Sequence, residues 1–316
     1  MIKPLVAATL ATAALGAAAA ATAVHVHTSS PDGFSTNSVW IDDGQEVTVI
    51  DTQFTPQLAE ALLADIRRQT RSPVRRVIVT HPNPDKFNAL SVFHREGADS
   101  IASRETAARM AGVHAYKQYY WVQIAKAFTA ESYTRLEMPR TLFDQTLTLP
   151  LKNGDSLTLS TLPSAGVSAT QTVVRIDSTG DLVVGDLVAN RTHAWLEGAV
   201  DSGKPVFDLA GWLADLRALP ALAAGKPGAR LFAGRGPALP VAESVSEQQA
   251  YLIAADAAIG RQEAKLGVDR AALTDPARQG PIVQAVRDEL VRSFPAHAMP
   301  DLVSYSLYGW LASRPR

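Results

Sequence analysis

A buried strand that runs into a polar, proline-rich turn is the segment that most constrains how this chain folds. Residues 74–90, with the sequence VRRVIVTHPNPDKFNAL, begin with the apolar run of that strand and continue into the turn. The turn carries His81, Asn83, Asp85 and Lys86. Polar turns after the strands of α/β proteins are where such folds usually place their chemistry. The segment therefore predicts a sheet with a functional site at the end of this strand.

Strand and helix patterns alternate along most of the chain. Alternating or continuous apolar runs beside turn residues predict strands at 38–41, 46–50, 74–80, 100–102, 171–176, 181–184 and 230–233, and further strands within 141–163. Helical periodicity predicts helices at 55–69, 103–130 and 207–223, and a mostly helical stretch over 241–316. This mixture predicts α/β layers, with sheets inside and helices outside.

The N-terminus has the order of a secretory signal peptide. Lys3 precedes an Ala-rich apolar run that ends in Ala21-Thr22-Ala23, a small-residue cleavage motif. A retained transmembrane anchor is the alternative, because the run is nearly long enough to span a bilayer. Alanine is weakly hydrophobic, so the pattern favours a signal peptide over 1–23 and a periplasmic or secreted protein without a stable membrane span. The next segment, 24–33, is polar, and we expect it to be flexible.

Composition excludes several classes of protein. An apolar content of 47% and a charged content of 19% are typical of a globular protein with a sizeable core. The formal net charge of −1 argues against nucleic acid as a partner. The chain has no cysteine, which excludes disulfides and thiolate ligands for zinc.

Five segments together resemble a known family. They are STNSVWIDDGQEVTVIDTQ, VIVTHPNPDKFNAL, PSAGVSATQTVVRI, LVVGDLVANRTHAWL and LFAGRGPALP. In this order they resemble the signature segments of the metallo-β-lactamase-fold hydrolases. The resemblance implies an α/β fold, the four-layer αββα sandwich of metallo-β-lactamase type, over 34–240, with the site at one edge between two sheets. Residues 241–316 would then be a helical C-terminal extension that packs on the same domain.

The resemblance identifies the positions at which active members hold metal. Those members have a His-x-His-x-Asp-His turn, a later His, a bridging Asp and a final His. This chain keeps His81 at the first His, Asp85 at the Asp of the turn, and Asp186 at the bridging Asp. These three are the surviving metal-ligand positions.

The other four ligand positions carry different residues. Asn83 and Lys86 replace imidazoles in the turn, Val167 replaces the later His, and Arg235 replaces the final His. An amide is a poor ligand for zinc, and an alkyl side chain is none. A divalent ion about 5 Å from a fixed cation is repelled by roughly 6 kcal/mol at an effective dielectric of about 20. The resemblance therefore implies a degenerate metal site, and we expect no metal there.

The two cations suggest a replacement for the metals. Asp85 and Asp186 would be costly to bury without compensation. An ammonium and a guanidinium in the space of the metals would neutralise them. We expect Lys86 and Arg235 to substitute for metal ions and to form a salt-bridge network with both carboxylates.

Two functions remain open. The first is an exported, non-catalytic pseudoenzyme without zinc or another cofactor, which binds a small ligand or a protein partner. The alternative is an ester, thioester or lactam hydrolase with an atypical site. It would hold one zinc through His81, Asp85 and Asp186. It could also work without metal, with His81 as the base and Lys86 and Arg235 stabilising an oxyanion. His81 and Asp85 are the catalytic candidates.

Ligand-binding candidates surround the turn. They are His81, Asn83, Lys86, Arg235 and His193. His193, in NRTHAWL, stands where related hydrolases often have a His near the substrate loop, and the alternative is an ordinary loop residue. The two cations predict a cationic pocket and therefore an anionic ligand.

Aromatic residues gather in two helical stretches. Those around 116–121 could line a pocket or meet a membrane, although the core of a helix on a sheet is favoured. Those around 305–311 could contact a partner chain, although packing on the protein's own sheet is favoured.

Overall fold

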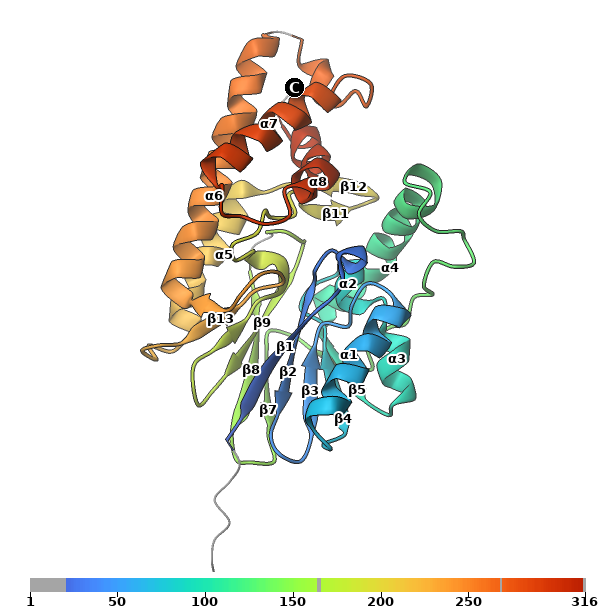
Figure 1. Cartoon of the computed structure of the whole chain (residues 1–316), viewed down its shortest axis with the longest axis vertical. Helices are drawn as coiled ribbons and strands as arrows, with labels where there is room; N and C mark the ends of the chain where they lie inside the picture. Colours follow the sequence, from blue (N-terminus) through green and yellow to red (C-terminus); the bar gives the residue numbers. More distant parts are fainter. Residues whose placement is uncertain (1–20, 164–165, 268, 315–316) are drawn as a thin grey trace, which may run out of the picture.

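Two six-stranded sheets face each other at the centre of the molecule, with helices outside both. The computed structural model describes residues 21–163, 166–267 and 269–314. One apolar core fills the space between the sheets, and a further core lies between each sheet and its helices. Figure 1 shows these layers. The predicted αββα sandwich is confirmed.

The first sheet contains the predicted central strand. Its strands in spatial order are β1 (Ala23–Thr28), β2 (Asn37–Asp42), β3 (Val47–Ile50), β4 (Val74–Ile78), β5 (Asp99–Ser103) and β6 (Thr141–Phe143). β1, β2 and β3 pair antiparallel, and β3 to β6 pair parallel. Successive side chains of a strand point to opposite faces. Val49 therefore packs toward the helices, while Ile50 packs toward the second sheet.

Helices follow the strands of the first sheet, and the two longer ones begin with a side-chain cap. They are α1 (Pro56–Gln69), α2 (Pro84–Phe87), α3 (Leu90–Arg95) and α4 (Arg104–Tyr119). The Thr55 side chain accepts from the Leu58 N–H at the start of α1, and that of Ser103 accepts from the Thr106 N–H at the start of α4. Such caps satisfy amides that a helix start leaves unpaired.

The second sheet closes the sandwich. Its order is β14 (Leu239–Pro240), β13 (Arg230–Phe232), β10 (Leu182–Val183), β9 (Gln171–Ile176), β8 (Ser156–Leu162) and β7 (Thr146–Pro150). β10 and β13 pair parallel, and the other neighbours pair antiparallel. Because β4, β10 and β13 all end at one edge, their following turns converge there (Figure 1).

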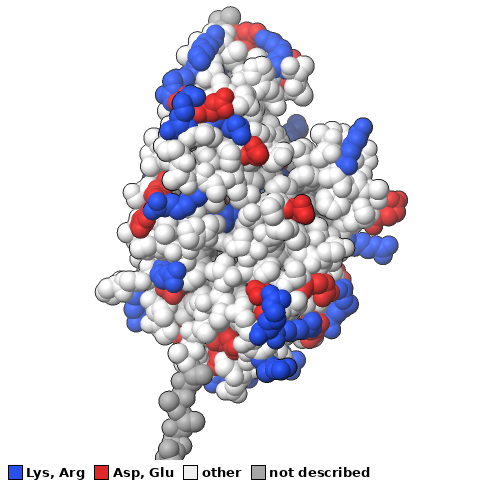
Figure 2. Space-filling view, viewed as in Figure 1, with Lys and Arg blue, Asp and Glu red and all other residues white. Residues whose placement is uncertain are grey.

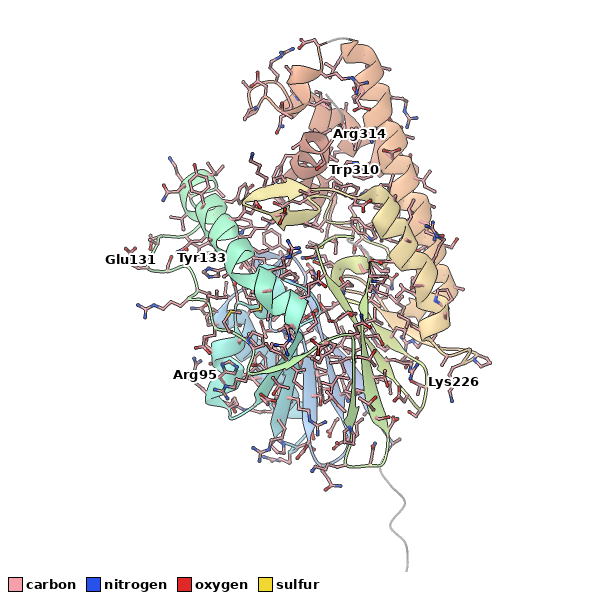
Figure 3. All side chains as sticks on the ribbon, turned by 180° about the vertical axis from the view of Figure 1, so that it is seen from behind. Arg95, Glu131, Tyr133, Lys226, Trp310 and Arg314 are labelled. Carbon is pink, nitrogen blue, oxygen red and sulfur yellow. The ribbon has the colours of Figure 1, made fainter. Side chains whose placement is uncertain are left out.

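The C-terminal helices share the core of the second sheet. The outer elements are α5 (Leu209–Leu222), α6 (Val241–Leu266), α7 (Gly280–Ser293) and α8 (Asp301–Ala312), with short helices η1 (Pro31–Gly33), η3 (Gly185–Leu187) and η4 (Arg270–Leu273). Trp310 of α8, labelled in Figure 3, stacks on Phe207 with ring centroids 3.8 Å apart. Leu307 and Trp310 belong to the same core as Leu231 of β13. The 305–311 side chains in this core therefore pack within the protein itself.

Three sequence predictions need correction. Segment 24–33, expected to be flexible, forms β1 and η1, because Val24 and Val26 alternate with His25, which stacks on Trp40. The helix expected over 103–130 leaves α-helical geometry after Tyr119 and ends in a π-helical turn, η2 (Tyr120–Ile124). The hairpin β11 (Ala199–Asp201) and β12 (Lys204–Val206) was not predicted, since three-residue strands give little periodicity.

The signal-peptide prediction for 1–23 lies mostly outside the described residues. Within 21–163, 166–267 and 269–314, no helix combines the length and the apolar character needed to cross a bilayer.

Candidate functional site

The turns after three strands bring four charged side chains together. Asp85 and Lys86 lie on α2 after β4, Asp186 lies on η3 after β10, and Arg235 follows β13. Gly234 allows the last two turns to touch, because a Cβ at this position would overlap the Asp186 carboxylate. Residues more than a hundred positions apart therefore meet at one sheet edge.

These four side chains form a closed set of ion pairs, here called the charge quartet. Lys86 Nζ lies 2.9 Å from Asp85 Oδ2 and 2.9 Å from Asp186 Oδ1. Arg235 Nη2 lies 3.1 Å from Asp85 Oδ2, and its Nη1 lies 2.8 Å from Asp186 Oδ1. The ion pairs expected from the sequence are therefore present, and each cation contacts both carboxylates.

Attraction within the charge quartet keeps its members ionised despite their burial. Burial raises the pKa of Asp186, but the charges of Arg235 and Lys86 hold that pKa far below its usual value. Burial lowers the pKa of Lys86, yet Asp186 and Asp85 together raise it. All four groups are therefore ionised at neutral pH, and their charges sum to zero.

His81 lies behind the charge quartet rather than in open space. Its side chain is fully buried, and its Nε2 is 3.8 Å from Asp186 Oδ2 with no hydrogen-bond partner in the described residues. Thr80 donates its backbone N–H to Asp51, and its hydroxyl lies 2.9 Å from His81 Nδ1. Burial lowers the pKa of His81 to about 4, so its imidazole is neutral at pH 7.

The residues at this edge do not fit a zinc ion. Zinc sites use three or four nitrogen, sulfur or carboxylate donors around one point. Here the ammonium of Lys86 occupies the point between the two carboxylates, and His81 contributes the one imidazole of the seven family positions. Across the described parts of the chain, no three His, Asp or Glu side chains are arranged to hold a metal ion.

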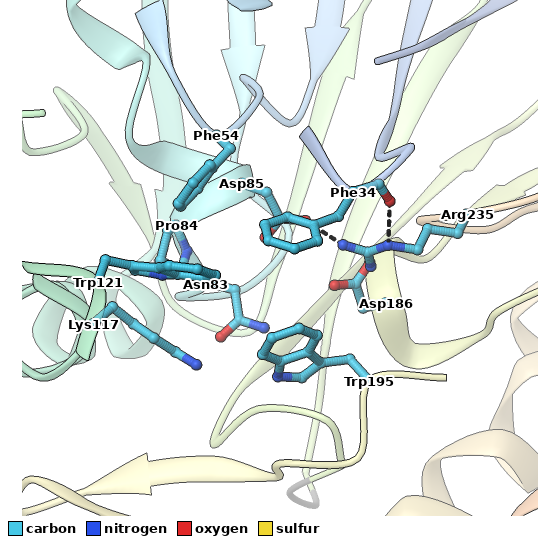
Figure 4. Close-up of a pocket in the computed structure, with 10 residues that line it drawn as sticks. All are labelled: Phe34, Phe54, Asn83, Pro84, Asp85, Lys117, Trp121, Asp186, Trp195 and Arg235. Atoms are coloured by element: carbon cyan, nitrogen blue, oxygen red, sulfur yellow. Dashed lines mark hydrogen bonds and ion pairs between the residues drawn. The ribbon is translucent and has the colours of Figure 1, made fainter. Parts of the chain in front are cut away.

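A small pocket opens beside the charge quartet, and aromatic rings form its walls. Figure 4 shows Phe34, Phe54, Trp121 and Trp195 around it. Ring centroids are 5.6 Å apart between Phe34 and Trp121 and 6.1 Å apart between Phe34 and Trp195. The other lining residues are Asn83, Pro84, Asp85, Lys117, Asp186 and Arg235. The aromatic stretch around 116–121, expected to be core, therefore supplies Trp121 to a pocket.

A second buried ion pair borders the pocket on the side of the C-terminal helices. Lys117 of α4 donates to Glu197, and Glu197 also accepts from Trp195 Nε1 at 2.9 Å and from the Tyr308 hydroxyl. The Lys117 ammonium lies 5.0 Å from the centre of the Trp195 ring. This pair connects α4 with α8.

The sequence predicted a cationic pocket, but these ion pairs leave the pocket without an excess of positive charge. Lys86 and Arg235 are balanced by the two carboxylates of the charge quartet, and Lys117 is balanced by Glu197. An excess positive charge is therefore absent among the lining residues of the described structure. The sequence indicated the cations but could not show that each is paired.

The structure places the predicted ligand-binding residues in different positions relative to the pocket. Asn83 and Arg235 line the pocket, whereas His81 and Lys86 lie beneath its surface. His193 is buried elsewhere and shares a 2.9 Å hydrogen bond with the hydroxyl of Tyr251 on α6. It contacts the C-terminal helical part rather than the pocket.

Sequence reasoning missed several pocket residues, namely Phe34, Phe54, Lys117, Trp195 and the neighbouring Glu197. Trp195 lies inside one of the family-like segments and Phe34 immediately precedes another, so proximity to the site could have identified them. Lys117 and Glu197 are 80 positions apart, and no local pattern predicts their pairing.

Comparison with known proteins agrees with the fold. The sequence model described as the metallo-beta-lactamase superfamily matches residues 31–235. A metallo-beta-lactamase from Pontibacter korlensis is 20% identical, with a TM-score of 0.52 over 72% of this chain and 93% of that one. TMB-1 is 18% identical, with a TM-score of 0.50 over 74% and 93%. The DIM-1 metallo-beta-lactamase is 15% identical, with a TM-score of 0.51 over 73% and 92%.

Proposed function

The chain belongs to the metallo-β-lactamase superfamily, and we propose that it is an exported, non-catalytic member that binds a small ligand without zinc. The observation that carries this proposal is the position of Lys86 Nζ, 2.9 Å from an oxygen of each retained carboxylate. Both carboxylates are already neutralised there, so they have no charge left to attract a metal.

Replacing this arrangement by zinc would be costly. The ammonium of Lys86 would have to leave a fully buried position, and the guanidinium of Arg235 would remain beside the incoming ion. Their repulsion offsets much of the roughly 10–16 kcal/mol that a structural zinc site supplies. The position of Val167 offers no donor in return.

The residues present also support binding better than hydrolysis. Salt-bridged cations do not generate hydroxide from water, which is what catalytic zinc does. His81, the candidate base, is fully buried and does not line the pocket. The aromatic walls next to the charge quartet are typical of a small-molecule site. Export is proposed from the signal-like N-terminus.

Elemental analysis of the mature protein tests the proposal. The protein is purified without chelator, exposed to excess zinc, dialysed, and measured for metal content and melting temperature. We expect less than about a tenth of an equivalent of zinc and an unchanged melting temperature, because a ligand that does not bind cannot stabilise. About one zinc per chain, lost in Asp186→Asn, together with turnover of esters, thioesters or lactams, would overturn the proposal.

A reversion variant provides the positive control. Asn83→His, Lys86→His, Val167→His and Arg235→His together restore the family pattern of ligands around Asp85 and Asp186. This variant should take up zinc under the same conditions, which shows that the assay detects a competent site.

A further inference from the structure

The pocket beside the charge quartet contains an amide side chain that has no hydrogen-bond partner among the described residues. This side chain is Asn83, which lines the pocket and whose amide makes no hydrogen bond with another described residue. An amide can donate two hydrogen bonds and accept others at its oxygen. Figure 4 shows it directed between Lys117 and Trp195. It is therefore a free polar group, able both to donate and to accept, that the pocket offers to a ligand.

The charged side chains of the pocket are already committed to one another. Arg235 donates to Asp85, to Asp186, and to the backbone oxygen of Phe34 at 3.0 Å. An ion that enters would lose its hydration without gaining an unpaired opposite charge, and burying an unpaired charge is expensive. The pocket therefore favours an uncharged group.

The aromatic walls continue outward to the C-terminal helices. Trp121 contacts Tyr120 with ring centroids 5.1 Å apart, and Phe34 contacts Tyr305 at 6.3 Å. Beyond these rings, a groove of about 490 Å³ lies between η2 and helices α7 and α8, lined by Tyr120, Tyr305 and Tyr308 among others. Figure 2 shows the surface indented between the α4 arm and the C-terminal helices.

The sizes of the pocket and the groove indicate a ligand with a small end and a larger body. The pocket itself leaves about 30 Å³, which is room for little more than one water molecule. The pocket therefore has room for a small end beside Asn83, and the tyrosine-lined groove has room for the body of a ligand. Tyr305 is 47% exposed, and Trp121 lies on a π-helical turn, a geometry that is frequent at functional sites.

We infer that the ligand of this chain is an uncharged molecule with an amide-like end and an aromatic or apolar body. The end hydrogen-bonds to Asn83, and the body stacks along the tyrosines of the groove. The C-terminal helices, which lie outside the matched region 31–235, are thus part of the binding site. This inference rests on the proposed function, because a zinc ion in the quartet would change the charge of the pocket.

Three probes of equal length test the ligand class. They are 4-phenylbutanamide, 4-phenylbutanoate and 4-phenylbutylammonium, with binding measured by calorimetry and by ligand-observed NMR on the full chain. We expect the amide to bind at least about tenfold more tightly than either ion, which corresponds to roughly 1.4 kcal/mol. A preference for either ion, or no binding of the amide at millimolar concentration, overturns the inference.

Matched variants assign the contacts. Asn83→Leu should remove the preference for the amide, because it keeps the size of the side chain but not its hydrogen bonds. Tyr305→Ala should weaken all three probes, whereas Tyr119→Ala, at the end of α4, 62% exposed and outside both cavities, should change none. An unchanged preference in Asn83→Leu contradicts the inferred anchor. The zinc measurement is a separate experiment. A protein that binds no zinc but prefers an ionic probe would contradict the inferred ligand class and leave the proposed function intact.

Discussion

Two buried charge systems border the same pocket, and they are built differently. The charge quartet joins three turns of the sandwich, and each of its cations contacts two carboxylates. The Lys117–Glu197 pair joins α4 to the C-terminal helices, and its other partners are Trp195 and Tyr308. A network with shared partners resists loss of its geometry more than a single pair does. The sandwich edge should therefore be the rigid side of the pocket and the helical side the adaptable one.

Removing Lys86 should have the largest effect on stability. Lys86→Met keeps the apolar stem but leaves Asp85 and Asp186 with one cation between them. Breaking a fully buried ion pair in this way costs about 3–5 kcal/mol. Urea denaturation at pH 7 measures the loss. Lys152→Met is the matched control, because Lys152 is half exposed and 3.7 Å from Glu46, and such pairs contribute about 1 kcal/mol or less.

A double variant shows whether the loss comes from the quartet itself. Asp186→Asn removes the one excess negative charge that Lys86→Met leaves in the charge quartet. The combined variant should be less destabilised than the sum of the single losses, by about 1 kcal/mol or more. Two results would show that the charge quartet does not stabilise this sheet edge. One is additive losses of unfolding free energy in the double variant, and the other is a loss in Lys86→Met no larger than that in Lys152→Met.

The quartet also shows how far the sequence alone could lead. The family-like segments located Asp85, Asp186 and Arg235 at one edge, because strand ends converge in a predictable way in this fold. The charges of Lys86 and Arg235 then predicted the ion pairs. The neutral character of the pocket was not predicted, since it depends on Lys117 meeting Glu197 across the fold.

Other differences arise from packing that local patterns do not encode. Residues 24–28 are too polar to predict a strand, yet they complete the sheet edge through pairing with β2 and the contact of His25 with Trp40. His193 lies in a family-like segment, but a hydrogen bond to Tyr251 on the C-terminal extension directs it away from the pocket. In both cases, contacts with residues distant in the sequence determine the local structure.

Removing the negative charge of the helical pair should have an intermediate effect. Glu197→Gln leaves the Lys117 ammonium without its counter-charge, although Lys117 lines the pocket and can turn toward water there. We expect a loss of about 1–3 kcal/mol, typical of a buried group that loses its partner. The protease susceptibility of α8 should rise as well, because Tyr308 shares the same carboxylate.

An exposed pair is the control for this variant. Glu243→Gln removes a carboxylate that pairs with Arg191 near the surface, so stability and proteolysis should stay close to those of the unmodified protein. If Glu197→Gln destabilised the protein as much as Lys86→Met, the distinction between a rigid and an adaptable side would be lost.

Acid should affect the helical side through His193, with the smallest of the three effects. The sandwich edge responds in the same pH range, because burial also lowers the pKa of His81 to about 4. Burial, together with the charges of His297 and Arg287, lowers the pKa of His193 from 6.5 to about 4. Between these values the unfolded chain binds more protons than the folded one, so stability falls as the pH drops from about 6.5 to about 4. The carboxylates of the quartet have lowered pKa values and lose their contribution only in stronger acid.

Urea unfolding between about pH 7 and pH 4 measures this acid sensitivity. His193→Gln removes the titrating group and keeps a hydrogen-bonding side chain near Tyr251. Its stability should therefore depend less on pH in this range than that of the unmodified protein. His27→Gln is the control, because that histidine lies on the edge strand β1 beside Asp65, away from the C-terminal helices. Equal pH dependence in the unmodified protein and in His193→Gln would mean that acid acts through other groups, such as His81 at the sandwich edge, and not through His193.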